Sequence, residues 1–173
     1  SINNVVDISN LVMLETGQQL HFYDLAKIPA REITVVDGLK ETYTALDGIG
    51  YEIEPEDIMI TTGGKAIGIA GIMGGDDSKI DEETKCIIIE AAQFNHVSIR
   101  NSSRRLNCMT EAAMHFTKGV EPLAGVKAVA RSVQLLMEYA DASGIEETVV
   151  CGTIHDEKKK VSVTLSHINA LLG

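Results

Sequence analysis

Residues 86–92 read CIIIEAA, a short apolar run that carries one carboxylate, Glu90. A continuous run of this length, rich in β-branched residues, predicts a strand of the kind that is covered on both faces. An unpaired charge inside such a strand is costly, so Glu90 must either meet a partner or face a cavity. Two interpretations stay open: a structural ion pair with an arginine such as Arg100 or Arg104, or an acceptor aimed at a hydroxyl or amine of a ligand.

The segments on either side of this strand predict a mixture of helices and strands. Helices are expected over 2–16, with Ser1 as cap and Gly17 as stop, from the cap Asn95 to about Leu106, and from near Pro122 to Gly144. Further strands are expected at 33–36, 51–53, 58–61, 66–72, 148–154 and 161–165. This interspersed order predicts a mixed α+β fold of the α/β kind, a layered sandwich in which helices flank a mixed central β-sheet.

Composition limits the class of protein. The chain has 173 residues and a formal net charge of −10, whereas a domain that binds nucleic acid on its own is usually basic. No apolar run reaches membrane-spanning length, and the cysteines Cys86, Cys108 and Cys151 lack CxxC spacing. These features predict a cytoplasmic protein without a membrane partner, whose thiols are buried as small apolar residues. Any role with RNA would need basic surface from elsewhere.

The glycine-rich stretch TTGGKAIGIAGIMGGDD at 61–77 does not fit a nucleotide site. A phosphate loop needs a glycine five residues before Gly64 and a hydroxyl after the lysine, but Met59 and Ala66 stand there. Glycines inside a strand more often allow another backbone or a ligand to approach, so Gly71 and Gly74 are expected to form a wall. The histidines lack HxxxH or HExxH spacing, so no metal site and no catalytic triad are expected.

Two polar residues have open roles on sequence grounds alone. His21 lies in GQQLHFYD, residues 17–24, where an ionisable ring and two aromatics follow the end of the first helix. They either fill the core or line a pocket. Thr110 is more often a helix cap than a ligand contact in a segment such as RRLNCMTEAAM.

Three blocks, in order, carry a family resemblance. They are NNVVDISNLVMLETGQQLHFYDLAKI, AIGIAGIMGG and IIIEAAQFNHVSIRNSSRRLNCMTEAAMHFTKGVEP. Together they closely resemble the editing domain of the bacterial phenylalanyl-tRNA synthetase β subunit over residues 1–155. The final SHINALLG resembles the opening of the next domain of that subunit, so residues 156–173 are expected to be a linker and the start of that domain.

The resemblance implies a set of site residues. His21 falls on the histidine of the family motif Q-P-L-H-A-F-D, Glu90 on the reader of the tyrosine phenol, and Thr110 on a pocket threonine. These three would be the catalytic group. The substrate-binding residues implied are Ser9, Asn10, Gly71, Gly74 and Ala112.

The chain also departs from the family pattern. Gln19 replaces the proline before the histidine, and Phe22-Tyr23 replace Ala-Phe. Asn107-Cys108-Met109 replace a Gly-Leu-[RH]-like run, and Thr117 stands where the family has a glutamate.

The function implied is hydrolysis of tyrosyl-tRNA(Phe) formed in error, as part of a phenylalanine–tRNA ligase with (αβ)₂ subunits. The implied partners are the tRNA 3′ end carrying tyrosine, the α subunit and a second β subunit. No cofactor is expected in this segment, since ATP and magnesium would be used elsewhere in the enzyme. The alternatives are a non-catalytic structural and tRNA-contacting module with editing lost, and, more weakly, a stand-alone accessory domain.

Overall fold

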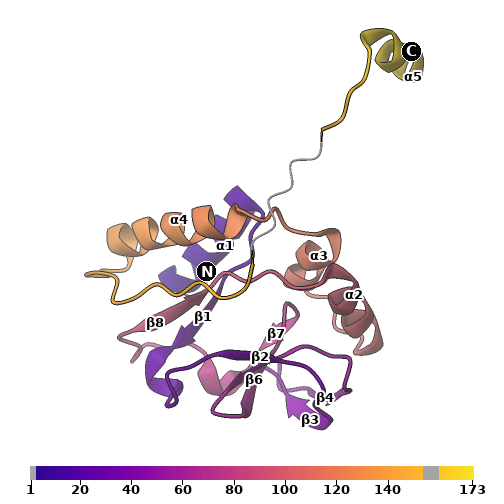
Figure 1. The fold of residues 1–173 in the computed structure, drawn as a ribbon. Coiled ribbons are helices and arrows are strands. Elements are labelled where there is room, and N and C mark those ends of the chain that lie inside the picture. Colours follow the sequence, from indigo (N-terminus) through magenta and orange to yellow (C-terminus); the bar gives the residue numbers. More distant parts are fainter. Residues whose placement is uncertain (1–2, 154–159) are drawn as a thin grey trace.

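Strand β8 (Ile87–Glu90) pairs antiparallel with β1 (His21–Asp24), and this two-stranded ribbon separates two layers of the domain (Figure 1). The computed structural model describes residues 3–153 and 160–173. The register sets His21 opposite Glu90 and Phe22 opposite Ile89. Because side chains alternate along a strand, Phe22 and Ile89 share one face of the ribbon, whereas His21, Tyr23 and Glu90 share the other.

Two helices cover the face that carries Phe22. Helix α1 (Asn4–Thr16) packs against α4 (Ala124–Tyr139), and both lie above the ribbon in Figure 1. Their shared core consists of Ile8, Val12, Leu20, Phe22, Ala128, Leu135 and Leu136. Helix α1 is capped by Asn3, whose side chain accepts from the backbone N–H of Val6, and it ends at Gly17 with φ 74°. The expected stop is confirmed, and the expected cap, Ser1, lies outside the described residues.

The opposite face of the ribbon meets a second sheet. Its strand order is β2 (Thr34–Val36), β5 (Met59–Thr62), β6 (Lys65–Ile69) and β7 (Met73–Gly74). Gly63 and Gly64 have φ values of 54° and 79°, as a two-residue hairpin between β5 and β6 requires. A third sheet pairs β3 (Glu41–Thr44) with β4 (Gly50–Ile53), and the short 3₁₀ helices are η1 (Leu25–Lys27) and η2 (Asp76–Ser78).

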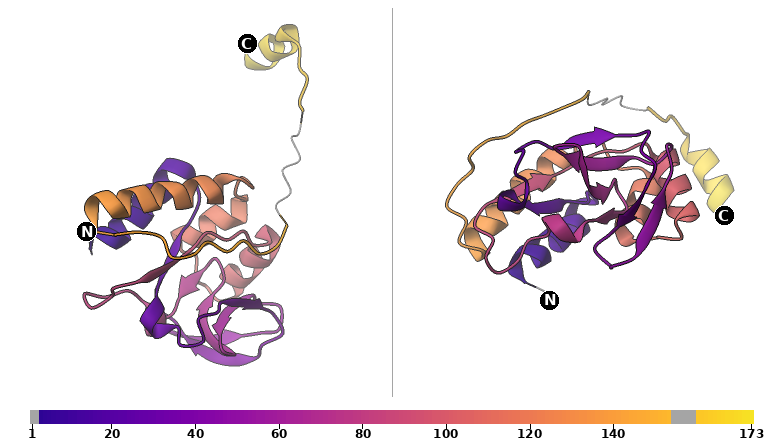
Figure 2. Two further views of the ribbon diagram at one scale, coloured as in Figure 1. Left: turned by 60° about the vertical axis from the view of Figure 1, so that its left-hand side comes forward. Right: turned by 90° about the horizontal axis from the view of Figure 1, so that it is seen from below.

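Helices α2 (His96–Arg105) and α3 (Glu111–Lys118) pack together beside the second sheet (Figure 2). Asn95 caps α2 as expected, with its side chain accepting from the N–H groups of Val97 and Ser98. The buried carboxylate of Asp57 ties α2 to the loop before β5. It accepts from Ser102 Oγ at 2.5 Å, from the backbone N–H of Glu54 at 2.9 Å and from the guanidinium of Arg105.

The mixed α+β class is confirmed, but the details differ from expectation at several points. All described strand pairs are antiparallel and form three sheets rather than one mixed central sheet. Strand β8 is only half-buried, because it belongs to a two-stranded ribbon and not to the interior of a larger sheet. Of the three thiols only Cys108 is buried, while Cys86 is half-buried and Cys151 is exposed.

The C-terminal part differs most. The strand expected at 148–154 is absent over its described residues 148–153. The strand expected at 161–165 is also wrong, because residues 161–164 have no regular structure and Leu165 begins helix α5 (Leu165–Leu172). Apolar β-branched residues favour strands only where a partner strand and a core are available, and residues 161–165 are exposed.

Candidate functional site

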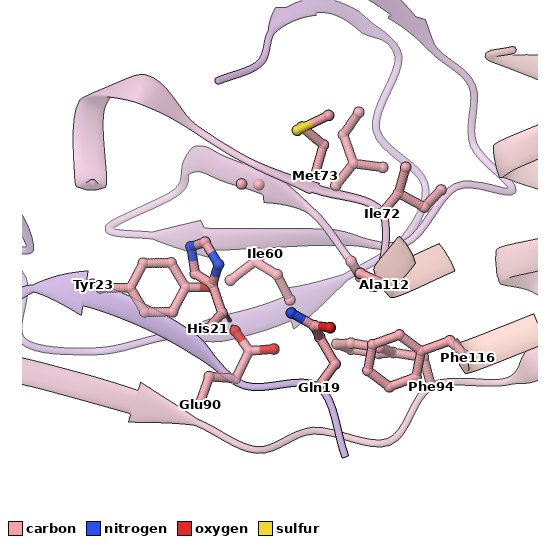
Figure 3. Close-up of a pocket in the computed structure, with 15 residues that line it drawn as sticks. Gln19, His21, Tyr23, Ile60, Ile72, Met73, Glu90, Phe94, Ala112 and Phe116 are labelled. Carbon is pink, nitrogen blue, oxygen red and sulfur yellow. Dashed lines mark hydrogen bonds between the residues drawn. The ribbon is translucent and has the colours of Figure 1, made fainter. Parts of the chain in front are cut away.

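The face of the ribbon that carries His21 and Glu90 opens onto a cavity of about 60 Å³ (Figure 3). Most of its wall is apolar, and its polar side chains come from residues 19–23 and from Glu90. The wall consists of Gln19, His21, Tyr23, Ile60, Gly68, Ile69, Ala70, Gly71, Ile72, Met73, Gly74, Glu90, Phe94, Ala112 and Phe116. The structure therefore brings together five of the eight site residues expected from sequence: His21, Glu90, Gly71, Gly74 and Ala112.

Glu90 has a partner within the chain, but that partner is not an arginine. The Tyr23 hydroxyl donates to Glu90 Oε2 at 2.5 Å. Arg100 instead donates to the backbone oxygen of Thr117, so the alternative of an ion pair between Glu90 and Arg100 is wrong. Burial raises the pKa of Glu90 above its usual range, and the bond from Tyr23 opposes that rise. Within the described residues Oε1 of Glu90 has no hydrogen-bond partner, so it remains free as an acceptor.

His21 is a neutral ring in this site. Burial lowers its pKa from the ordinary 6.5 to about 4, because the charged imidazolium would lose its hydration. The ring meets Tyr23 edge to face with centroids 4.4 Å apart. Its Nε2 atom is buried and has no hydrogen-bond partner in the described part of the chain. A neutral imidazole with an unpaired nitrogen suits a hydrogen bond to a ligand or water better than a strong acid–base role.

The lowered pKa of His21 can be tested through the pH dependence of stability. The unfolded chain binds a proton at position 21 below about pH 6.5 while the folded chain does so only near pH 4, so acidification between these values favours unfolding. We expect unfolding free energy to fall by about 2 kcal/mol more in the wild type than in His21→Gln, after allowance for solvent screening at this partly exposed ring. Urea unfolding from neutral pH to pH 4 measures this.

The variant keeps Glu90, whose raised pKa has the opposite effect on the pH dependence, so the difference between the two curves isolates the imidazole. Parallel curves for the wild type and His21→Gln would show that the ring is not held neutral by burial.

Two of the three glycines of the wall, Gly71 and Gly74, are required by close approach. A Cβ atom at Gly74 would lie 2.4 Å from Cε1 of His21, so only glycine lets strand β7 pass against the imidazole. Gly71 has φ 64°, and a Cβ there would lie 2.9 Å from Cδ2 of Phe116. The glycine-rich stretch therefore shapes a cavity wall, in agreement with the expectation from sequence.

Thr110 lies behind the wall. It caps α3 by accepting from the N–H of Ala113, and its hydroxyl donates to the carbonyl of Ile72 at 2.7 Å. This fixes the start of the helix that presents Ala112 and Phe116 to the cavity. Thr110 is thus placed as a positioning residue.

Ser9 and Asn10 are not brought to the cavity. Both belong to α1, which packs on the other face of the ribbon, and Asn10 is exposed. The Ser9 hydroxyl donates to the backbone oxygen of Val6 within the same helix.

Among the lining side chains that sequence reasoning did not assign are Gln19, Tyr23, Phe94 and Phe116. Gln19 and Tyr23 were visible as departures from a family motif, and that was the available signal. The Phe94–Phe116 pair, with ring centroids 5.2 Å apart, joins segments on either side of α2 and has no local sequence signature.

No group of three or more metal-ligating side chains occurs among the described residues. The described helices include none that is both long enough and apolar enough to cross a membrane.

The domain combines an antiparallel ribbon that two helices cover on one face with a glycine-walled cavity on the other. Residues 1–141 match the model of the B3/4 domain, and the chain belongs to that family.

Its curated relatives include phenylalanine–tRNA ligase beta subunits. The chain is 40% identical to the phenylalanine–tRNA ligase beta subunit of Staphylococcus haemolyticus strain JCSC1435 over 173 residues. It is 41% identical to the subunit of the same name from Staphylococcus aureus strain Mu50, also over 173 residues. Each match covers 99% of this chain and 22% of the relative, so the chain spans about a fifth of the length of these relatives. The resemblance inferred from the sequence blocks is confirmed.

Proposed function

We propose that this chain is the editing domain of a phenylalanine–tRNA ligase β subunit and hydrolyses the ester of tyrosyl-tRNA(Phe). The observation that carries the proposal is Glu90, a half-buried carboxylate with one free oxygen in a mostly apolar cavity. Tyrosine and phenylalanine differ by one hydroxyl, which an apolar pocket cannot reject strongly. An acceptor in such surroundings discriminates well, because a ligand without the hydroxyl leaves the acceptor unpaired.

The hydrolysis itself needs little from a protein base. Water adds to the ester carbonyl, the bond to the ribose oxygen breaks, and that oxygen takes a proton, which releases tyrosine and tRNA. An activated ester reacts once water is held against the carbonyl, and a neighbouring ribose hydroxyl of the substrate is available to assist. In this scheme the unpaired Nε2 of His21 orients substrate or water, and Thr110 acts by holding Ile72 and Ala112 in place.

Binding requires the wall to open. A volume of about 60 Å³ is room for a few water molecules, whereas an apolar cavity that holds benzene measures about 150 Å³. The Gln19 side chain is held by one long hydrogen bond, from its amide nitrogen to the Leu20 carbonyl at 3.3 Å, and its Oε1 is buried without a partner among the described residues. Its carboxamide lies between Glu90 and the Phe94–Phe116 pair in Figure 3, so we propose that Gln19 turns aside when tyrosine enters.

The partners follow from the family. We propose that the chain works in the cytoplasm within an (αβ)₂ ligase, on the 3′ end of tRNA(Phe), while ATP and magnesium serve aminoacylation elsewhere in the enzyme. With a net charge of −10 the chain offers little attraction for phosphates, so the tRNA would be gripped by other parts of the ligase.

The test is hydrolysis of preformed tyrosyl-tRNA(Phe) by the ligase that carries this domain. We expect tyrosyl-tRNA to be cleared much faster than phenylalanyl-tRNA. The alternative, a structural module with editing lost, predicts normal charging with phenylalanine while tyrosyl-tRNA persists, and that result would overturn the proposal.

A further inference from the structure

Tyr23 already supplies a phenol to Glu90. The strand register sets Tyr23 opposite Ile88, so Glu90 lies diagonally across the ribbon on the same face. The Tyr23 side chain is 2% exposed and its ring is fixed against His21, and from there the hydroxyl reaches Glu90 Oε2 at 2.5 Å. The bond is therefore built into the pairing of β1 with β8.

The Tyr23 hydroxyl stays protonated and hence remains a donor. Burial raises its pKa well above the ordinary range, and the nearby charge of Glu90 raises it further. The same bond stabilises the ionised form of Glu90, because it lowers a carboxyl pKa that burial raises. Tyr23 and Glu90 thus form a hydrogen-bonded pair before any ligand arrives, in which Oε2 is occupied and Oε1 is free among the described residues.

A carboxylate that already accepts one hydrogen bond discriminates less than a carboxylate that accepts none. A site rejects phenylalanine to the extent that a ligand without a hydroxyl strands the carboxylate. Here the carboxylate keeps its bond to Tyr23 whichever side chain enters. A phenol from the substrate must share Glu90 with an existing donor, which weakens the second bond that the same charge accepts.

We propose that Tyr23 is a specificity-determining residue, an internal phenol that competes with the tyrosine of the substrate for Glu90 and lowers the preference of the site for tyrosyl over phenylalanyl esters. This inference rests on the proposed editing function. The family motif Q-P-L-H-A-F-D has phenylalanine at this position, so Tyr23→Phe keeps the ring and removes only the hydroxyl.

The experiment compares Tyr23→Phe with the wild type in the intact ligase, using the ratio of kcat/KM for tyrosyl-tRNA to kcat/KM for phenylalanyl-tRNA. We expect the ratio to rise about tenfold. In the variant Glu90 accepts a hydrogen bond from the substrate phenol alone, and a hydrogen bond to a charged acceptor contributes enough free energy for a change of this size. The matched control is Tyr51→Phe. This variant deletes another phenol hydroxyl, which donates to Asp47 over 2.7 Å. Neither residue lines the cavity, so the ratio should stay unchanged.

A second readout does not depend on activity. In the 173-residue chain, ¹³C NMR titration of the Glu90 carboxyl should give a higher pKa in Tyr23→Phe than in the wild type. An unchanged pKa, or an ester ratio that stays level or falls in a ligase that clears tyrosyl-tRNA, overturns this inference alone. A ligase that hydrolyses neither ester overturns the proposed function, and this inference with it.

Discussion

Replacing Glu90 with alanine is expected to lower kcat/KM for hydrolysis of tyrosyl-tRNA(Phe) by about 100-fold, since a hydrogen bond to a charged group in an apolar site is worth roughly 1.5–3 kcal/mol. The variant removes Glu90, the one carboxylate among the described residues that line the cavity. It also leaves the Tyr23 hydroxyl without its described acceptor. The ratio of tyrosyl to phenylalanyl hydrolysis should fall toward unity, because the remaining wall cannot distinguish the two side chains. The measurement is single-turnover deacylation of each tRNA by the intact ligase.

Asp47→Ala is the matched control for Glu90→Ala. Asp47 also accepts a hydrogen bond from a tyrosine, Tyr51, but it does not line the cavity. We expect this variant to hydrolyse tyrosyl-tRNA at the wild-type rate, and both variants to charge phenylalanine normally. Wild-type editing by Glu90→Ala would show that the phenol is not read by this carboxylate.

Replacing Asp57 with alanine is expected to lower the unfolding free energy by about 2–4 kcal/mol, because it leaves hydrogen-bond donors without their acceptor, and a typical domain has only roughly 5–15 kcal/mol. The Asp57 carboxylate is 1% exposed and serves three donors, one from the loop at Glu54 and two from helix α2, at Ser102 and Arg105. Its removal leaves the buried Ser102 hydroxyl and the half-buried Glu54 N–H without their acceptor and detaches α2 from the loop before β5. Urea unfolding of the 173-residue chain measures the loss.

Asp77→Ala provides the comparison for Asp57→Ala. Asp77 pairs with Lys65 at the surface, where both side chains are more than half exposed, and such pairs contribute at most about 1 kcal/mol. A loss as small for Asp57→Ala as for Asp77→Ala would mean that the buried network adds nothing to stability.

Local patterns predicted the parts of the fold that local chemistry determines. Gly17 ends α1 and Asn95 begins α2, since a left-handed glycine and an Asx cap act within one helical turn. The eight-residue helix α3 was not predicted. Its cap, Thr110, was visible, but a helix of this length has too few turns to show a clear apolar period.

The sequence predicted a cavity that contains a carboxylate, but it predicted only some of the residues that line this cavity. The carboxylate in an apolar strand correctly indicated that Glu90 needs a partner or a cavity, and it has both. The partner could not be named, because Tyr23 lies 67 residues away and meets Glu90 only through the β1–β8 register. Ser9 and Asn10 were expected near the substrate, but alternation along β1 places α1 on the other face of the ribbon.

The central claim, that Glu90 reads the tyrosine phenol in this cavity, is tested most directly by a crystal structure with a non-hydrolysable 3′-tyrosylamido adenosine. The account predicts the phenol oxygen within hydrogen-bond distance of Glu90, about 2.5–3.0 Å, with Gln19 turned out of the cavity. A ligand bound with its phenol in solvent, or held at another surface while the cavity stays closed, would contradict it.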